Sequence, residues 1–255
     1  MYRRLARFNR KAPTGVKPPY IVFNPHTLPP CVRSSEDHVM ITAIDPGIKN
    51  CGLRVSIYSL VSGRSQTLLM CNLNFTHEAY HQTGSCGIET HYYPAIFTAF
   101  EPHRHYFIAS QYICVESQLP INYDLVRMSQ HIITYLMTMI RDQGSRPLII
   151  ELDPHTKTRM LGAPPRMTKP QNKAWCRGMA IYFLKFDGEF ECAQFLEQQG
   201  KGDDMGDVVC YEKCMILILT QGICRLPLPT TIPKHCPMEL EFTPISTHQV
   251  LNPFK

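Results

Sequence analysis

The chain of 255 residues is long enough to bury one sizeable hydrophobic core, and its 44% hydrophobic and 18% charged residues are typical of a globular protein. No apolar run reaches the about 18 residues that a membrane helix requires, and the N-terminus has no secretory h-region. We therefore expect neither a membrane protein nor a secreted one. The net charge is +5, which is modest, so its distribution along the chain is more informative than its size.

The 11 cysteines are odd in number and show no paired CxxC spacing. This usage predicts reduced, mostly buried thiols in an intracellular protein. A zinc site is the alternative, although the spacing of its candidate ligands fits no regular metal pattern. Those candidates are His77, His81, Cys86, His91, His103 and His105.

Residues 1–38 are predicted to form a basic, flexible arm, because they contain seven basic residues before the first acid at Glu36. An arginine-rich, acid-poor start also fits a mitochondrial presequence, which stays open as an alternative. Residues 39–221 are expected to form the folded domain, with 76–105 as an insertion rich in His, Tyr, Gly and Pro that holds one short helix. Residues 222–255 are predicted to be a Pro-rich tail.

Within the domain, short apolar runs predict strands and 3–4-residue periodicity predicts helices. Strands are expected at 39–45, 53–60, 67–75, 112–116 and 147–152. Helices are expected at 123–141, 172–186 and 203–221, with a short helix and a Pro-rich basic loop at 155–170. The order of three strands, then strand–helix–strand, then helices predicts an α/β fold with a mixed five-stranded sheet flanked by helices.

Four acidic positions stand where buried elements end or begin. Asp45 ends the first strand before Pro46-Gly47, and Glu116 ends the fourth. Asp204 and Asp207 share a face at the start of the last helix, as do Asp203 and Asp207, so the sequence leaves open which of the first two acids joins the set. Taken singly, these residues fit a turn cap, a surface acid or charges that favour a helix N-terminus. Together they predict a site for hard divalent cations, which prefer oxygen ligands.

Three motifs carry a resemblance to a known family: Ala43-Ile-Asp45-Pro-Gly47 with Asn50 and Gly52, Val115-Glu116-Ser-Gln118, and Lys201-Gly-Asp-Asp-Met-Gly-Asp207. In type, order and spacing they resemble the RuvC-type Holliday junction resolvases of the RNase H-like superfamily. The nearest likeness is to the branch of poxviruses, other large DNA viruses and yeast mitochondria. The resemblance covers about residues 39–221.

The resemblance implies a homodimeric endonuclease that resolves four-way DNA junctions by paired symmetric nicks. Two Mg²⁺ ions, with Mn²⁺ as a substitute, would be held by Asp45, Glu116, Asp207 and either Asp203 or Asp204. One ion would activate water and the other would stabilise the leaving 3′ oxygen. Neither a membrane partner nor a small-molecule cofactor is expected.

Apolar residues beyond the main stripe of helix 123–141 indicate a partner surface, or else burial by the 76–105 insertion. They are Ile133, Tyr135, Met137 and Ile140.

Basic residues near the acids are candidate phosphate contacts. The full set of DNA-binding candidates is Lys49, Gln118, Tyr123, Lys157, Arg159, Lys169, Lys173 and Arg177. The family's basic catalytic helper would correspond to Lys173 or Lys169. Leu119 and Tyr123 occupy positions from which family members part bases, with core packing as the alternative.

Other functions fit parts of the pattern. Another RNase H-like nuclease, acting on RNA–DNA hybrids or in strand transfer, would use the same set of metal-binding carboxylates. A non-catalytic junction-binding relative would share the basic surface. An actin-like ATPase also opens with a DxG turn, but it requires a second glycine-rich phosphate turn that this sequence lacks. The expected location is a viral factory in the host cytoplasm or the nucleus, with the mitochondrial matrix as the alternative.

Overall fold

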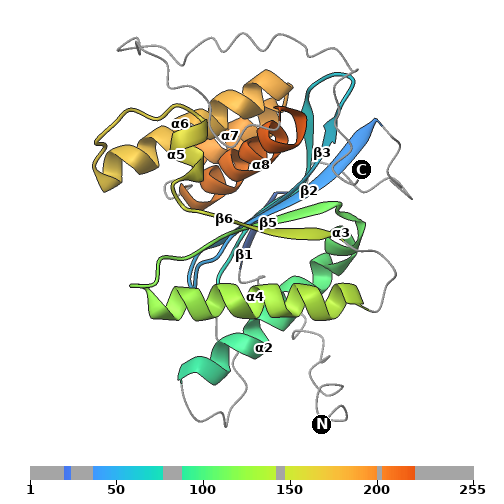
Figure 1. Ribbon diagram of the computed structural model, residues 1–255, viewed down its shortest axis with the longest axis vertical. Helices are drawn as coiled ribbons and strands as arrows, with labels where there is room; N and C mark the ends of the chain where they lie inside the picture. Colours follow the sequence, from blue (N-terminus) through green and yellow to red (C-terminus); the bar gives the residue numbers. More distant parts are fainter. Residues whose placement is uncertain (1–19, 24–36, 77–87, 142–146, 200–202, 222–255) are drawn as a thin grey trace.

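The computed structural model of the chain describes residues 20–23, 37–76, 88–141, 147–199 and 203–221 (Figure 1). A six-stranded mixed sheet with strand order β1-β4-β3-β2-β5-β6 runs through its centre. The strands are β1 (Tyr20–Phe23), β2 (His38–Asp45), β3 (Cys51–Ser59), β4 (Ser65–Leu73), β5 (Tyr112–Glu116) and β6 (Leu148–Leu152). Strands β2, β3 and β4 form an antiparallel meander, and β5 and β6 continue the sheet in parallel with β2.

This arrangement is an RNase H-like α/β fold, as the sequence predicted. The five expected strands are β2 to β6. Strand β1 is an addition, since it pairs antiparallel with β4 and lies within the segment 1–38 that we expected to be an arm. The other residues before Asp37, and the predicted tail 222–255, lie outside the described residues.

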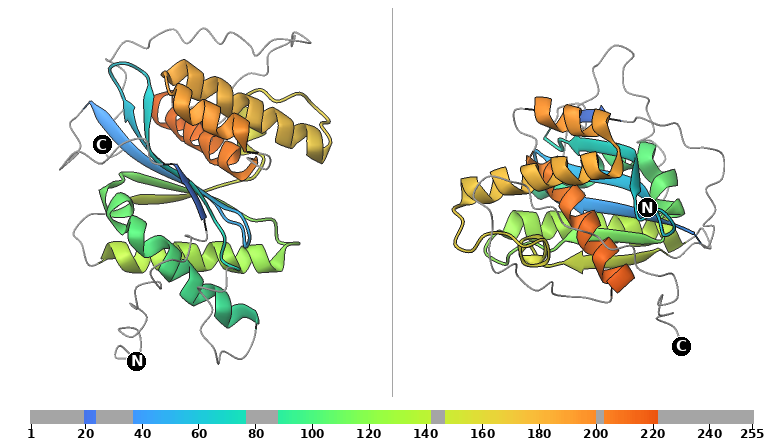
Figure 2. Two further views of the ribbon diagram at one scale, coloured as in Figure 1. Left: turned by 180° about the vertical axis from the view of Figure 1, so that it is seen from behind. Right: turned by 90° about the horizontal axis from the view of Figure 1, so that it is seen from above.

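Helices cover both faces of the sheet (Figures 1 and 2). One layer contains α2 (Ile88–Phe100), the 3₁₀ helix η2 (Glu101–His103), α3 (Arg104–Ala109) and α4 (Tyr123–Arg141). The other contains α5 (Thr156–Met160), α6 (Lys169–Asp187), α7 (Phe190–Gln198) and α8 (Asp203–Gln221). No helix among these described segments is long and apolar enough to cross a membrane.

The α2–α4 layer is more than a peripheral insertion. Ala95, Ile96, Ala99 and Phe100 of α2 are fully buried in the same core as the sheet. The predicted single short helix in 76–105 is therefore an underestimate, because 88–105 is helical throughout the described part. Tyr135 of α4 packs edge-on against Phe97 of α2 and donates a hydrogen bond to Glu101, with a donor–acceptor distance of 3.1 Å. A neighbouring helix of the same chain thus covers one of the side chains that indicated a dimer surface.

Alternation along β2 and β5 decides which face each acid occupies. Met40 and Ile44 point into the core beneath α2–α4, whereas Ile41 and Ala43 point toward α8. Since successive side chains in a strand alternate, Asp45 lies on the α8 side. Cys114 faces α8 in the same way, so Glu116 does too.

A cluster of buried charges joins α8 to the sheet and to the α6–α7 turn. We call it the Arg54 cluster; it comprises Arg54, Asp187, Glu189, Glu212 and Lys213. Arg54 of β3 is fully buried and pairs with both Glu189 and Glu212. Lys213 Nζ lies 2.5 Å from Asp187 Oδ2 and 3.0 Å from Ser65 Oγ. Because unpaired charges are costly to bury, these pairs restrict how α8 can rotate against the sheet.

Candidate active site

Asp45 and Glu116 meet at the same end of the sheet. Strands β2 and β5 pair in parallel with Ile44 opposite Val115, so the next residues in register are Asp45 and Glu116. Neighbouring strands lie about 4.8 Å apart, so the two carboxyl groups are close together. Burial raises the pKa of Asp45 well above its usual range, and the neighbouring Glu116 raises it further. Two carboxylates in this position favour a cation between them.

Helix α8 brings a third acid to this pair. Asp207 is half-buried, and its charge acts on the pKa of Asp45. Burial raises the pKa of Asp207, and Lys157 opposes that rise. Asp204 lies one turn earlier on α8 and is half-buried; its charge acts on the buried thiol of Cys51, as that of Asp45 does. The side chain of Asp203 lies outside the described residues.

Gly52 makes the approach of α8 to the sheet possible. It pairs with Asp45 across β2 and β3. A Cβ atom at this position would lie 2.5 Å from the backbone oxygen of Asp204. A side chain larger than hydrogen would therefore displace the first turn of α8, which carries Asp204 and Asp207.

Lys157 of α5 is the cation that the structure places among the acids. Its Nζ lies 2.9 Å from Asp207 Oδ1, and the residue is only 5% exposed. Burial alone would lower the pKa of Lys157, but the charges of Asp207, Glu116 and Asp45 outweigh burial and raise it. The sequence predicts Lys157 as a DNA contact, whereas the structure buries it beside the carboxylates.

Two further side chains complete the surroundings of the acids. Tyr211, one turn after Asp207, is buried with its ring 4.7 Å from Lys157 Nζ; its hydroxyl donates to the backbone oxygen of Pro154 at 3.5 Å, and burial with the nearby charge of Glu116 raises its pKa. Cys176 on α6 is buried and accepts a hydrogen bond from the thiol of Cys210 at its backbone oxygen; Cys210, burial and, in part, the charge of Asp207 raise the pKa of its thiol. The seven described cysteines are buried free thiols, as the composition predicted.

The donor set suits a hard divalent cation, because it consists of carboxylate oxygens brought together from β2, β5 and α8. As the described side chains stand, no group of three or more His, Cys, Asp or Glu is arranged to hold a metal ion. Lys157 provides a physical reason for this arrangement, since its ammonium group pairs with Oδ1 of Asp207, an oxygen that would otherwise be available to bind a metal ion. The same finding gives no support to a zinc site at His103 and His105; His77, His81, Cys86 and the side chain of His91 lie outside the described residues.

The expected DNA contacts fall into two groups. Lys49, Lys169 and Tyr123 are exposed, and Gln118 and Lys173 are half-buried. Arg159 is exposed but pairs with Asp153 at 2.7 Å. Arg177 donates hydrogen bonds to the backbone oxygens of Leu196 and Glu197, so it caps the end of α7. Arg177 is thus used within the chain, a role that the predicted DNA contact did not anticipate.

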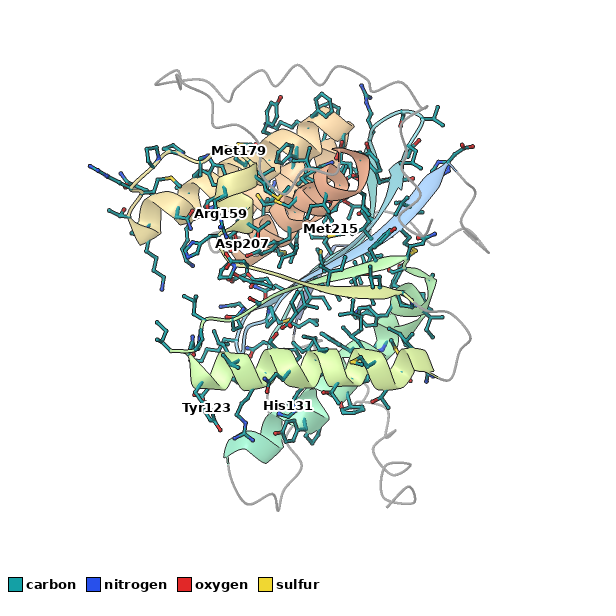
Figure 3. All side chains as sticks on the ribbon, viewed as in Figure 1. Tyr123, His131, Arg159, Met179, Asp207 and Met215 are labelled. Atoms are coloured by element: carbon teal, nitrogen blue, oxygen red, sulfur yellow. The ribbon has the colours of Figure 1, made fainter. Side chains whose placement is uncertain are left out.

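The loop between β5 and α4 presents apolar side chains beside Glu116. Leu119 is 45% exposed, Tyr123 62% and Ile121 91%. In Figure 3, Arg159 and Asp207 lie on the α8 side of the sheet and Tyr123 lies on α4, all three toward the left of the view. Core packing therefore does not explain these three residues. Ile121 is an exposed apolar residue that the sequence interpretation passed over.

Three residues of the site carried a weak signal or none. Lys157 was visible only as one member of a basic stretch. Tyr211 and Cys176 read as ordinary core residues of apolar helices. Helical spacing does place Tyr211 four residues after Asp207 and hence on the same face, which is the one signal that would have found it.

Comparison with known proteins places few constraints on activity. No protein-family model matches the sequence. Over 117 residues the chain is 28% identical to the uncharacterized protein 97L of invertebrate iridescent virus 3, which is 45% of this chain and 52% of the viral protein. The match thus spans about half the length of this curated relative.

Several solved structures are similar to the chain. RuvC from T. thermophilus, in complex with a Holliday junction substrate, has a TM-score of 0.47 at 12% identity, over 72% of this chain and 97% of RuvC. The fowlpox virus Holliday junction resolvase scores 0.44 at 14% identity, over 70% and 97%. The yeast mitochondrial Holliday junction resolvase scores 0.45 at 13% identity, over 73% and 85%. These are the kinds of protein that the sequence motifs resemble, but likeness at this level does not identify a reaction.

Proposed function

We propose that this chain is a divalent-metal-dependent DNA endonuclease that resolves four-way junctions. The observation that carries the proposal is the convergence of Asp45, Glu116 and Asp207, from three separate elements, around the ammonium group of Lys157. Burial, and after it the charge of Glu116, raises the pKa of Asp45 and Asp207, and buried carboxylates are costly unless a cation neutralises them. Hydrolysis of a phosphodiester is a reaction that such a carboxylate set serves.

Asp45, Glu116, Asp204 and Asp207 would hold two Mg²⁺ ions, or Mn²⁺ in their place. When bound, such ions supply an activated water and stabilise the leaving oxygen of the cleaved strand. Asp204 is preferred to Asp203 because its backbone packs on Gly52 beside Asp45 and its charge acts on Cys51. Tyr211 and Cys176 are buried near Glu116 and Asp207, whose charges act on their pKa values, and we expect them to help position these two carboxylates.

Lys157 is the basic residue that we place in the catalytic machinery. It neutralises Asp207 before substrate enters, and its ammonium group is positioned to stabilise negative charge on the phosphate that approaches the carboxylates. Lys173 lies one helical turn before Cys176 on α6 and remains a second candidate. Lys169 is exposed at the start of α6, where it suits a phosphate contact rather than catalysis.

Branched DNA is the proposed substrate because exposed apolar side chains stand beside the acids. Leu119, Ile121 and Tyr123 would pack against bases that are unstacked at a junction centre, whereas an intact duplex offers only backbone and groove edges at that point. Exposed Lys49 and Lys169 would contact the phosphates of the arms.

A homodimer would place one site on each of two symmetric strands and so produce paired nicks. Tyr135 and Ile140 are buried within the chain, but Met137 of α4 and Phe97 of α2 are exposed at 61% and 47%. These two side chains are the proposed apolar contacts of a dimer. Sedimentation of wild type and Met137→Glu would test this, since a monomeric wild type at micromolar concentration would contradict it.

The test of function is cleavage of a labelled four-way junction in Mg²⁺, beside a linear duplex of the same sequence and an RNA–DNA hybrid. We expect paired symmetric nicks confined to the junction. Cutting of the hybrid instead would make the chain a different RNase H-like nuclease. Tight junction binding without cutting in Mg²⁺ or Mn²⁺ would make it a non-catalytic binding protein.

A further inference from the structure

Arg166 has the backbone conformation that an arginine adopts least readily. Its φ is +60°, and it is the single non-glycine residue with positive φ in the described parts of the chain. The left-handed region brings Cβ too close to the following carbonyl oxygen, so a side chain there is strained. Pro164 and Pro165 restrict the backbone before Arg166, and a capping box between Thr168 and Gln171 fixes the backbone after it.

The strained backbone of Arg166 does not lead its side chain to a contact within the described residues. The residue is exposed, and it makes no hydrogen bond or ion pair with any residue that the structure describes. Its neighbours in the basic stretch differ, since Arg159 pairs with Asp153 and Arg177 caps α7. Strained residues that persist in a fixed loop are often there for a ligand rather than for the fold.

Both ends of the Arg166 loop are held against α8 near Asp207. Before the loop, α5 places Lys157 Nζ 2.9 Å from Asp207 Oδ1; after it, α6 packs on α8, where the thiol of Cys210 donates to the backbone oxygen of Cys176 at 3.5 Å. At 1.5 Å per residue, α6 begins about 10 Å from Cys176. Phosphates of one DNA strand follow one another at about 3.4 Å along the helix axis. Arg166 lies three residues before α6, which adds at most about 10 Å, so it is within about 20 Å of Cys176, a span of roughly six phosphates along one strand.

We propose that Arg166 is a dedicated contact to a backbone phosphate of the DNA strand that enters the carboxylate site. The inference rests on the proposed function. A guanidinium group binds phosphate oxygens through paired hydrogen bonds, so a fixed orientation of Arg166 is useful there. The rigid, strained loop holds the group outward before DNA arrives, and this lowers the entropy lost on binding.

The test compares Arg166→Gly and Arg166→Ala with Arg64→Ala. Arg64 is a matched control because it is exposed, has the same charge and lies in the β3–β4 turn, at the opposite end of the sheet from Asp45. Affinity for a four-way junction and for a linear duplex is measured in Ca²⁺ over a series of salt concentrations, and the Tm of each variant is measured alone.

We expect both Arg166 variants to bind DNA about tenfold more weakly and the slope of log K against log salt to fall by about 0.9, the loss of one phosphate contact. Arg166→Gly should also melt above Arg166→Ala, since glycine accepts a positive φ. Arg64→Ala should leave the slope unchanged. Wild-type slopes in both Arg166 variants would overturn the inference. Equal wild-type affinity for junction and duplex would instead overturn the proposed function, while the slopes measured on duplex would still decide the role of Arg166.

Discussion

The Nζ atom of Lys157 lies 2.9 Å from Oδ1 of Asp207, so a short helix after β6 supplies the cation for an acid on the last helix of the fold. This pair joins the two halves of the site, because Asp207 also acts electrostatically on Asp45. It also gives Asp207 a counterion within the chain.

Removal of the Lys157 charge should make the protein depend on a divalent cation. In Lys157→Met the carboxylates lose their internal counterion, so we expect a lower Tm without metal and a larger rise in Tm on addition of Mg²⁺ than in wild type. Thermal melts over a Mg²⁺ series measure this. Lys169→Met, which removes an exposed charge from the start of α6, should respond as wild type does. Equal Mg²⁺ responses of Lys157→Met and wild type would argue against the idea that the Lys157 ammonium group and a metal ion neutralise the same carboxylates.

Gly52 should tolerate no side chain. In Gly52→Ala the new methyl group would meet the backbone oxygen of Asp204 at 2.5 Å, so α8 must shift. We expect a loss of about 1–3 kcal/mol in the free energy of unfolding, together with loss of cleavage. Denaturant melts and junction cleavage are the measurements.

Gly178→Ala is the matched control for Gly52, because nothing lies within 4 Å of a Cβ at this position of α6. Alanine in a helix interior should add about 0.5–1 kcal/mol to the free energy of unfolding. If both glycine variants behave alike, close contact between β3 and α8 is not what Gly52 provides.

Truncation of Arg54 should cost far more stability than truncation of an exposed arginine. Arg54→Ala leaves Glu189 and Glu212 buried without their shared cation, and we expect a loss of about 3–5 kcal/mol. Arg104→Ala removes an exposed pair with Glu101 at 3.5 Å, for which less than about 1 kcal/mol is expected. Urea unfolding compares the two. Similar losses would show that the Arg54 cluster is solvated rather than buried.

His103 should make the fold sensitive to mild acid. Burial lowers the pKa of His103 from 6.5 to about 4, with a contribution from His105. Between these pH values the unfolded chain binds a proton that the folded chain does not, so stability falls as pH falls from about 6.5 toward 4. The full effect is roughly 3 kcal/mol. Melts of wild type and His103→Gln at pH 7 and pH 4.5 should show the steeper loss in wild type; parallel losses would contradict the assignment.

Periodicity was enough to predict the elements that carry the acids. The expected bounds of α4, β5 and α8 agree with the structure, and each has an apolar run or stripe that tertiary contacts do not override. Helix α7 was missed because its buried residues, Cys192, Ala193 and Leu196, are small or few. Strand β1 was missed because its stability comes from pairing with the edge of β4, which a local pattern does not reveal.

The acids of the site were predictable, but their partners were not. Asp45, Glu116 and Asp207 each follow from an element boundary, whereas the position of Lys157 depends on how α5 turns back onto α8. The roles of Arg177 as a helix cap and of Arg54 as a buried counterion likewise depend on tertiary packing. A basic residue in a sequence shows charge, and only the fold shows what that charge faces.

The most direct test of the central claim is single-turnover cleavage of a four-way junction by Asp207→Asn, with junction binding measured in parallel. The control is Glu197→Gln, an exposed acid of α7 that pairs with Lys185 at 2.8 Å. Because Asp207 serves the reaction centre and the basic surface serves DNA binding, the rate should fall at least about a thousandfold in Asp207→Asn while affinity stays within about threefold. Glu197→Gln should cleave as wild type does. Normal cleavage by Asp207→Asn would contradict the account, since the acid at the centre of the site would then have no part in the chemistry.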